Sequence, residues 1–218
     1  MSIICAIHQP NFFPWLGYFD KIKKADIFVF LDNVQNQKTG GSWVNRVKLN
    51  CFGKTKWYTC PIRHYPGVVS INDVEFADSG WSTSLISVLE NYYKKYSNCS
   101  SVLDLILKLI RKKDYCYIAD LNKDIILYFA NFLGCSARFI SKKDLEIESH
   151  SVSMLIDICK TVGADTYLCG GGASDYQDDR LFSEAGINLI YQNFSPTLYG
   201  DPKKFLPGLS IIDYLMSI

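Results

Sequence analysis

The sequence predicts an α/β fold, in which a five-stranded, mostly parallel, doubly wound sheet carries an inserted subdomain that is β-rich first and then helical. Short apolar runs alternate with amphipathic stretches toward both ends of the chain, and the middle breaks this rhythm. The length of 218 residues suffices for one large domain with an insertion. The sheet domain is expected to comprise residues 1–42 and 134–218, and the insertion residues 43–133.

Five apolar runs are the predicted strands, because buried parallel strands appear in a sequence as short, nearly continuous apolar segments. In chain order they cover residues 3–8, 27–31, 137–140, 166–169 and 188–191. Residues 15–24 are expected to form the crossover helix between the first two strands. A helix over residues 152–162, with Ser149 or Ser151 as its cap and Gly163 at its end, is predicted before the fourth strand.

The insertion begins with extended pieces around turns. Residues 43–49 and 56–62 flank Cys51-Phe52-Gly53-Lys54 and predict a β-hairpin, and residues 68–76 predict a further extended piece. The periodicity that follows predicts three helices, over residues 82–96, 102–112 and 118–133.

A last helix is expected at the C-terminus, with Ser210 as its N-cap. Ile211, Ile212 and Leu215 would form its apolar face, so this helix is mainly a packing element. Asp213 is expected to face solvent, with a partnership to a bound cation as the alternative.

Composition excludes several classes of function. The 23 basic and 22 acidic residues nearly balance, which gives no electrostatic reason to expect a nucleic acid or an acidic membrane as the main partner. The basic group at residues 108–113 is expected to complement a helix dipole. No apolar run approaches the roughly 20 residues of a membrane span and no charged leader precedes one, so a cytoplasmic protein is expected.

The eight cysteines are scattered without a CxxC pair, which is typical of buried reduced thiols. The three histidines, at positions 8, 64 and 150, share no metal-ligand spacing, so no metal site is expected. The residues leave the cofactor open, and they also leave open whether the protein forms a homodimer.

Three loops follow the ends of predicted strands, which is where ligands bind in open α/β sheets. The first is the stretch IHQPNFFPWLGY, in which Pro10 and Pro14 exclude helix and hold the backbone extended. His8, as a general base or a hydrogen-bond donor, and Gln9 are expected to meet a ligand there. The aromatic residues of the stretch are expected to pack in the core.

The second loop, residues 32–38, carries Asp32, amides and Lys38 directly after the second strand. Such residues bind ribose or sugar hydroxyls, and Lys38 and Arg46 could face phosphates. A turn rich in Asp and Asn is also ordinary loop chemistry, and this alternative stays open.

The third loop is the run Gly170-Gly171-Gly172-Ala173-Ser174-Asp175-Tyr176 after the fourth strand, where three glycines let backbone amides approach an anion. A tight turn capped by Ser174 is the alternative. No motif pairs Cys169 with a base, so a nucleophilic role for Cys169 is not favoured.

Six segments, in this order and over nearly the whole chain, resemble the WbqC-like family of bacterial proteins: HQPNFFPWLGYFDKI, FLDNVQ, WVNRVKL, YLCGGGASDY, AGINLIYQNF and LSIIDYL. The resemblance implies a role in O-antigen, lipopolysaccharide or other surface polysaccharide biosynthesis, on an unusual sugar in its nucleotide-linked form. It marks as motif positions His8, Gln9, Pro10, Asp32, Gln35, Asn45, Arg46, Gly170, Asp175 and Tyr176. The run GGGA departs from the Ser-Gly-Pro type of sequence expected at that loop.

The opening of the chain also looks like the first β-α-β unit of pantothenate synthetase, which implies a nucleotidyl-transferase-like sheet and a nucleotide site. The paired histidines that those enzymes place around the helix start are absent. Pro14 or Trp15 and Tyr18 stand near those positions. The analogy therefore supports the fold more than it supports adenylyl transfer.

Three functions follow as hypotheses. The first is a transferase that moves an acyl or aminoacyl group to the amino group of a nucleotide-linked sugar. His8 would take a proton from the sugar amine, and Asp32 would orient the imidazole or a hydroxyl. Arg46 with the Gly170–Gly172 amides would hold the diphosphate. The second is an ATP-dependent ligase or nucleotidyltransferase, and the third a non-catalytic sugar-nucleotide binding protein. The expected substrate-binding residues are Gln9, Asn11, Gln35, Lys38, Asn45, Arg46, Gly170, Gly171, Gly172, Ser174, Asp175 and Tyr176.

Overall fold

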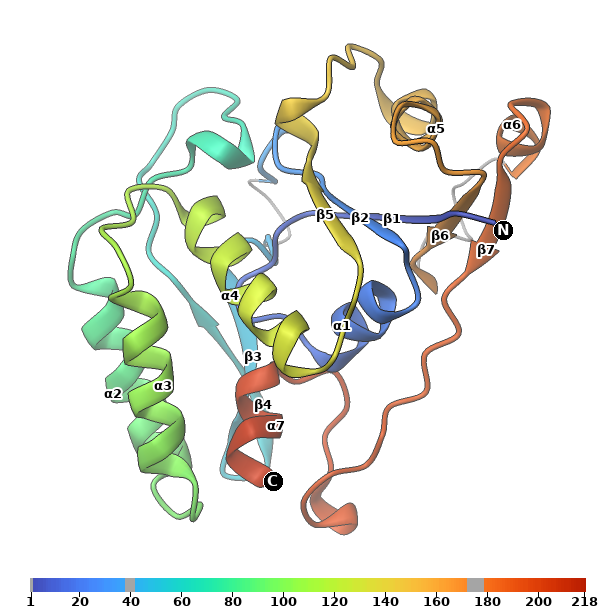
Figure 1. Cartoon of the computed structure of the whole chain (residues 1–218). Helices are drawn as coiled ribbons and strands as arrows, with labels where there is room; N and C mark the ends of the chain where they lie inside the picture. The colour runs from blue at the N-terminus through green and yellow to red at the C-terminus, as the bar shows by residue number, and fades with distance from the viewer. Residues whose placement is uncertain (1, 38–41, 172–178) are drawn as a thin grey trace. The chain divides into compact units, whose positions relative to one another are not determined.

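The computed structural model describes residues 2–37, 42–171 and 179–218 of the chain (Figure 1). Contacts divide the chain into two compact units, each made of three separate stretches. Unit 1 consists of Met1–Gln9, Gly17–Asn33 and Phe129–Ser195, and unit 2 of Pro10–Leu16, Val34–Tyr128 and Pro196–Ile218. The division into a sheet domain of residues 1–42 and 134–218 and an inserted subdomain of residues 43–133 stays a prediction.

Unit 1 contains the five strands that the apolar runs predict, and all of them are parallel. They are β1 (Ile4–His8), β2 (Ile27–Phe30), β5 (Arg138–Ser141), β6 (Thr166–Cys169) and β7 (Asn188–Tyr191). Their order in the sheet is β5-β2-β1-β6-β7. The chain therefore proceeds outward from β1 in one direction, through β2 to β5, and then in the other direction, through β6 to β7.

This reversal explains why helices cover both faces of the sheet. The helix α1 (Leu16–Lys23) lies on one face, and α5 (Ser151–Thr161) and α6 (Asp179–Glu184) lie on the other (Figure 1). Right-handed crossovers that proceed in opposite directions place their helices on opposite faces. The predicted doubly wound arrangement is thus confirmed for the five-stranded sheet.

Unit 2 contains the predicted β-hairpin, formed by β3 (Arg46–Cys51) and β4 (Lys54–Thr59). Its two-residue turn has positive φ at both positions, 52° at Phe52 and 83° at Gly53. Two-residue turns of this kind match the right-handed twist of the strands. The Asn50 side chain stabilises the turn, because its Oδ1 accepts a hydrogen bond of 2.8 Å from the Gly53 amide.

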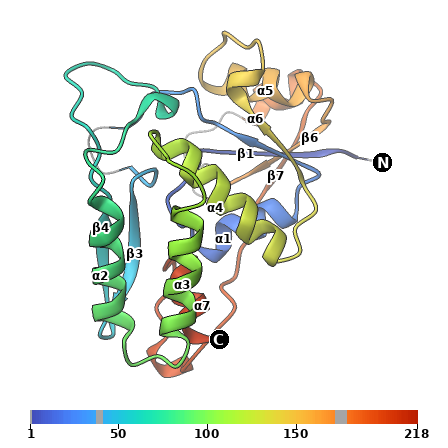
Figure 2. The ribbon, with the colours of Figure 1, turned by 60° about the vertical axis from the view of Figure 1, so that its left-hand side comes forward.

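The helices of unit 2 lie close to where periodicity predicts them. They are α2 (Trp81–Tyr93), α3 (Cys99–Ile110), α4 (Ile118–Phe132), which ends in unit 1, and α7 (Ile211–Ser217). Figure 2 shows α2 and α3 side by side as a helical hairpin. As predicted, Ser210 caps α7, with its Oγ accepting a hydrogen bond from the Ile212 amide.

The extended piece predicted over residues 68–76 is confirmed only in part, because the 3₁₀ turn η1 (Ile71–Asp73) interrupts it. The backbone is extended at Ser70 before the turn and at Val74 after it. Isolated bridges pair Ser70 with Gln35, Glu75 with Tyr117 and Phe76 with Ile62. Ile71 and Val74 are fully buried, which explains the apolar pattern around the turn. Two further 3₁₀ turns are η2 (Lys142–Asp144) and η4 (Pro202–Lys204).

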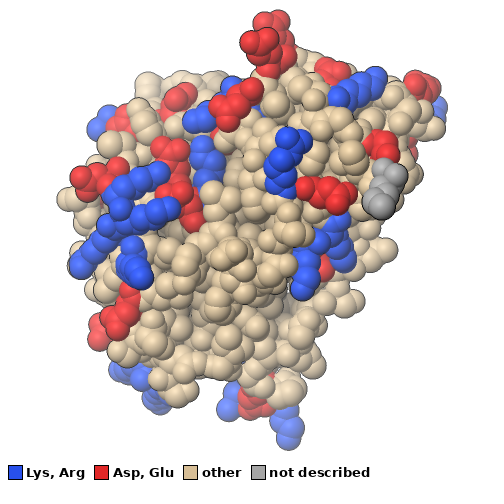
Figure 3. All heavy atoms as spheres, viewed as in Figure 1, with Lys and Arg blue, Asp and Glu red and all other residues tan. Residues whose placement is uncertain are grey.

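Charged side chains of both signs are interspersed on the face shown in Figure 3, as the near balance of charge in the sequence suggests. No helix in the described part of the chain is long and apolar enough to cross a membrane. All eight cysteines are free thiols, and six of them are buried.

Residues 10–16, which follow β1, pack as part of unit 2. Phe12 and Phe13 are almost fully buried, which confirms the prediction that they belong to the core. The fully buried Asn122 of α4 holds this loop, because its Nδ2 donates hydrogen bonds of 2.8 Å to the carbonyl oxygens of Pro10 and Val44. Nothing in the sequence pattern signals this link, which joins residues 112 positions apart.

Substitution Asn122→Ala is expected to lower the free energy of unfolding by about 2–4 kcal/mol, because two buried carbonyl oxygens lose their donor. Urea titration followed by circular dichroism measures this. The exposed Asn131, on the same helix, provides the control Asn131→Ala, for which a change within about 0.5 kcal/mol is expected. Equal midpoints for the two variants would contradict the role assigned to Asn122.

Candidate functional site

The carboxyl ends of β1 and β6 in unit 1 form the candidate site. These neighbouring strands mark the point where the strand order reverses, and ligands of open α/β sheets bind outside such a point. The two strands are parallel, with Ala6 paired with Leu168, so His8 at the end of β1 and Cys169 at the end of β6 lie at the same edge of the sheet. The structure thus brings together the ends of the first and third loops that the sequence singles out.

His8 is the last residue of β1 and is only partly exposed. Its Nδ1 lies 3.1 Å from the carbonyl oxygen of Gln9. Because a carbonyl oxygen only accepts, this hydrogen bond requires a proton on Nδ1 and leaves the lone pair on Nε2. The imidazole packs edge-on against the Tyr18 ring at 4.7 Å, and the Tyr18 hydroxyl donates to the same Gln9 carbonyl at 2.9 Å.

The charge state of His8 follows from its surroundings. Its pKa is lowered to about 3, mainly by burial and also by the positive charge of Lys21, while the hydrogen bond to the Gln9 carbonyl opposes the shift. The imidazole is therefore neutral near pH 7. It can accept a proton, although only weakly while no anion lies nearby to offset the charge of Lys21.

Lys21 of α1 is a residue of this site that sequence reasoning missed. It is 3% exposed, its Nζ donates a 2.8 Å hydrogen bond to the Ile7 carbonyl, and it lies 5.9 Å from the centre of the Tyr167 ring. Burial lowers its pKa to about 8, opposed by Cys169 and Cys5. A signal was available, because Tyr18, Lys21 and Ile22 occupy positions i, i+3 and i+4, which places Lys21 on the apolar face of its helix.

Glycine follows β6 at positions 170 and 171. A Cβ at Gly170 would meet nothing within 4 Å, whereas one at Gly171 would lie 3.3 Å from the Gln192 carbonyl oxygen. The backbone at Gly170 is therefore open to close approach by a ligand. Gln192 follows β7 and fixes α1 at this edge, since its Nε2 donates to Gly17 O at 2.7 Å and to Asp20 Oδ2 at 2.8 Å.

Asp32 follows β2 and is fully buried. Its carboxylate accepts a 2.8 Å hydrogen bond from Ser141 Oγ and a 3.2 Å hydrogen bond from the Lys143 amide. Ser141 is the last residue of β5, and Lys143 follows that strand. These contacts tie the ends of β2 and β5 together, which is a structural role. A role for Asp32 in orienting His8 stays a prediction.

The other predicted site residues are divided between the units. Gln9, Gly170 and Gly171 lie in unit 1, and Asn11, Gln35, Asn45 and Arg46 lie in unit 2. Asn11 is buried, Gln35 is exposed, and Asn45 Nδ2 donates to the Cys60 carbonyl at 3.0 Å. The joint binding of a diphosphate by Arg46 and the glycine loop remains a prediction. Outside the described residues lie Lys38, Gly172, Ser174, Asp175 and Tyr176.

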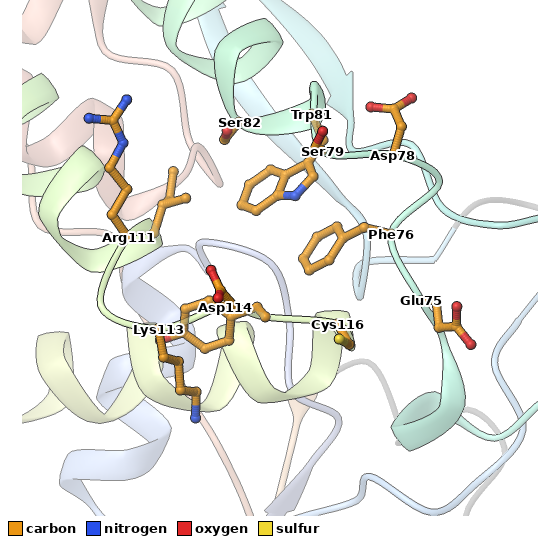
Figure 4. Close-up of a pocket in the computed structure, with 12 residues that line it drawn as sticks. Glu75, Phe76, Asp78, Ser79, Trp81, Ser82, Arg111, Lys113, Asp114 and Cys116 are labelled. Carbon is orange, nitrogen blue, oxygen red and sulfur yellow. The ribbon is translucent and has the colours of Figure 1, made fainter.

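Unit 2 has a cavity of about 430 Å³, lined from the start of α2 and from the segment after α3. Figure 4 shows the Phe76 and Trp81 rings stacked on one side, 4.4 Å apart, with Arg111, Lys113 and Asp114 on the other. Glu75 and Asp78 also line it, so its charges are of both signs. The basic group predicted to complement a helix dipole partly pairs with Asp124, which lies 3.2 Å from Lys113 Nζ and 3.6 Å from Lys112 Nζ.

A second cavity of unit 2, of about 530 Å³, lies beside the β3–β4 hairpin. Asn45 and Arg46, which the sequence singles out, line it together with Asn36, Arg63, His64 and Tyr65. No common spacing joins these positions in the sequence, because Asn36 follows β2, Asn45 and Arg46 stand at the start of β3, and Arg63, His64 and Tyr65 follow β4. Among the described residues, no three His, Cys, Asp or Glu side chains are placed to hold a metal ion.

Comparison with known proteins places the chain in a family. It is 26% identical over 222 residues to Rv1507c, an uncharacterized protein of Mycobacterium tuberculosis (strain ATCC 25618 / H37Rv), and the match covers 98% of this chain and 93% of that protein. No solved structure gives a significant match. The model of the WbqC-like protein family matches residues 9–218. The chain therefore belongs to the WbqC-like protein family.

Proposed function

We propose that the protein is a transferase that moves an acyl or aminoacyl group to the amino group of a nucleotide-linked sugar. The observation that carries the proposal is His8 at the end of the central strand β1. Its neutral imidazole, with Nδ1–H directed to the Gln9 carbonyl and the Nε2 lone pair available, has the form of a general base.

The reaction needs a proton acceptor. As the sugar nitrogen attacks the carbonyl carbon of the donor, a C–N bond forms and the bond from that carbon to the leaving group breaks, with its electron pair leaving on the donor fragment. The nitrogen must lose one proton, and His8 Nε2 is the acceptor in this proposal. A diphosphate near Lys21 would offset the ammonium charge and raise the pKa of His8 toward the working pH.

The anionic part of the substrate is proposed to lie at the end of β6. The backbone at Gly170 is open to close approach, and the buried ammonium group of Lys21 supplies positive charge beside β1 and β6. Anions are favoured where backbone amides and a buried cation converge. The donor and any cofactor are left open, and the place of this reaction in O-antigen or surface polysaccharide biosynthesis is part of the proposal.

The test is product formation by the purified protein. Nucleotide-linked amino sugars are incubated in turn with acyl-coenzyme A, with aminoacyl donors, and with ATP and Mg²⁺, and mass spectrometry follows the nucleotide sugar. The proposal predicts a product heavier by the transferred group. Gly170→Val should abolish its formation, because a Cβ at this position meets nothing within 4 Å and the branched side chain would fill the space proposed for the ligand.

The control is Gly67→Val, in unit 2, where a Cβ also meets nothing within 4 Å. This variant should retain the wild-type rate. Consumption of ATP coupled to product would instead establish the ligase or nucleotidyltransferase alternative. Binding of a nucleotide sugar without product from any donor would establish a non-catalytic binding protein.

A further inference from the structure

The cavity of about 530 Å³ in unit 2, which we name the hairpin cavity, has basic side chains in its wall. Its described lining includes Arg46, Arg63 and His64, and neither Asp nor Glu. Glu75, which lies outside the lining, pairs with Arg63 at 2.6 Å. A cavity with basic groups at its wall and a carboxylate outside it favours an anionic ligand.

Asn36 adds a second and independent observation. The residue is 5% exposed and lines the cavity, and its Oδ1 is buried with no hydrogen-bond partner among the described residues. A buried amide oxygen without a donor costs free energy, which a ligand that brings a hydroxyl or an N–H group would recover. The ligand is therefore expected to carry donor groups as well as negative charge.

Arg46 connects the cavity with an aromatic pair on the outer face of the hairpin. Its guanidinium carbon lies 4.1 Å from the centre of the Trp57 ring, and Trp57 lies 4.9 Å from Trp43 in an edge-on arrangement. Lys48 lies over the same pair, 5.2 Å from Trp57 and 5.4 Å from Trp43. The two tryptophans are 41% and 37% exposed, which is unusual for side chains of this size.

The register explains this arrangement. Lys48 is paired with Trp57 and Arg46 with Thr59, so alternation along the strands places all four on one face, while Val47 and Leu49 point to the core. The N–H groups of a guanidinium lie in its own plane, so they point outward when its face stacks on a ring. Arg46 can thus present donors to an anion while its face remains on Trp57.

We infer that the hairpin cavity, with the adjoining Trp43–Trp57 pair, is a binding site for a nucleoside diphosphate. Arg46 and Arg63 bind the phosphates, the Asn36 amide accepts from a ribose hydroxyl, and the base stacks on the exposed tryptophans. Exposed aromatic rings beside basic side chains bind bases of any identity by stacking. This inference concerns unit 2 alone and does not depend on catalysis in unit 1.

The test uses the full chain, with UDP, ADP, GDP, CDP and inorganic pyrophosphate as probes. Tryptophan fluorescence and calorimetric titration follow binding. At least one nucleoside diphosphate is expected to bind and to change the fluorescence. Arg46→Gln should weaken binding at least about tenfold, through the loss of charge-assisted hydrogen bonds. Arg111→Gln, in the cavity of about 430 Å³ beside α2, is the matched control and should bind as the wild type does.

Two further variants separate the parts of the site. Trp57→Ala should weaken nucleotide binding about tenfold and leave pyrophosphate binding within about twofold, because only the base stacks. Glu75→Gln should strengthen binding of both, because it removes the carboxylate that competes for Arg63. Thermal melts confirm that each variant is folded, and Trp57→Leu, which also removes the aromatic ring, replaces Trp57→Ala if the latter is not.

The inference is overturned if no nucleoside diphosphate binds with a Kd below about 1 mM, or if folded Arg46→Gln and Asn36→Ala both bind as the wild type does. His8→Asn is expected to keep the fluorescence response, because His8 belongs to unit 1 and the hairpin cavity to unit 2. Product formation by His8→Asn therefore tests the proposed transferase. The fluorescence response of Arg46→Gln to nucleotides tests the nucleotide site separately.

Discussion

His8→Asn lowers kcat of the proposed transfer by about 10²–10⁴-fold, the range that a positioned general base contributes. An asparagine amide can replace Nδ1–H as the donor to the Gln9 carbonyl, but it has no basic lone pair to take the place of Nε2. The loss is therefore expected in kcat, with the KM for the nucleotide sugar changed only a few-fold. Steady-state kinetics with the substrate pair identified by mass spectrometry measures both.

His150→Asn is the control for this experiment. His150 is exposed at the N-cap of α5, and its side chain makes no capping hydrogen bond. Its replacement should leave kcat within about twofold. If His8→Asn turned over as fast as His150→Asn, His8 would not be the base.

Asp213→Ala is expected to lower the free energy of unfolding by about 3–5 kcal/mol, a large part of the 5–15 kcal/mol of a typical domain. The carboxylate accepts from the hydroxyls of Tyr93 at 3.0 Å and Tyr199 at 2.9 Å. Tyr93 in turn accepts from the Asn50 amide at 2.9 Å. Removal of the carboxylate leaves two hydroxyl donors of this network without an acceptor.

Urea titration measures this loss, with Asp104→Ala on α3 as an exposed control expected within about 0.5 kcal/mol. Burial raises the pKa of Asp213, although the tyrosine hydroxyls lower it. The folded state thus holds this proton more tightly than the unfolded state. The stability that protonated Asp213 contributes is present below its pKa in the unfolded state and is lost as pH rises through its pKa in the folded state. Asp213→Asn should remove that pH dependence, and equal stability of Asp213→Ala and Asp104→Ala would contradict the network.

Asp213 also shows what the sequence could not predict. The pattern around it predicts the helix, the Ser210 cap and the apolar face, and the structure confirms them. The sequence predicts a solvent-facing Asp213, and this is wrong, because the residue is 3% exposed. A buried carboxylate needs donors, and here they come from Tyr93, which is 120 residues away, and Tyr199. Local periodicity carries no information about partners at that distance.

The sheet was predictable because its strands are nearly continuous apolar runs. All four residues of β2 and of β6 are buried, and short continuous apolar runs of this kind are typical of strands inside a parallel sheet. The edge strands β5 and β7 are less buried, but flanking turns still marked them. The order β5-β2-β1-β6-β7 had no such signal, since several orders satisfy the same runs.

The candidate site was predictable only in part. His8 and Gly170 were found because His8 ends one strand and Gly170 follows another, and ligands are expected at strand ends whichever strands are neighbours in the sheet. Lys21 was missed because a lysine in an amphipathic helix is ordinarily expected in solvent. Arg63 and His64 lie in a loop without a motif, and only the folded chain brings them beside Asn36 and Arg46.

The most direct test of His8 as the base is the ¹⁵N spectrum of a histidine-labelled sample. The chain has three histidines, so His64→Gln and His150→Gln assign the signals. His8 is expected to be neutral, to carry its proton on Nδ1 and to titrate only near pH 3, and a nucleotide-linked amino sugar is expected to shift its signal. A His8 signal that titrates near pH 6.5, or that stays in place when such a sugar is bound at saturation, would contradict it.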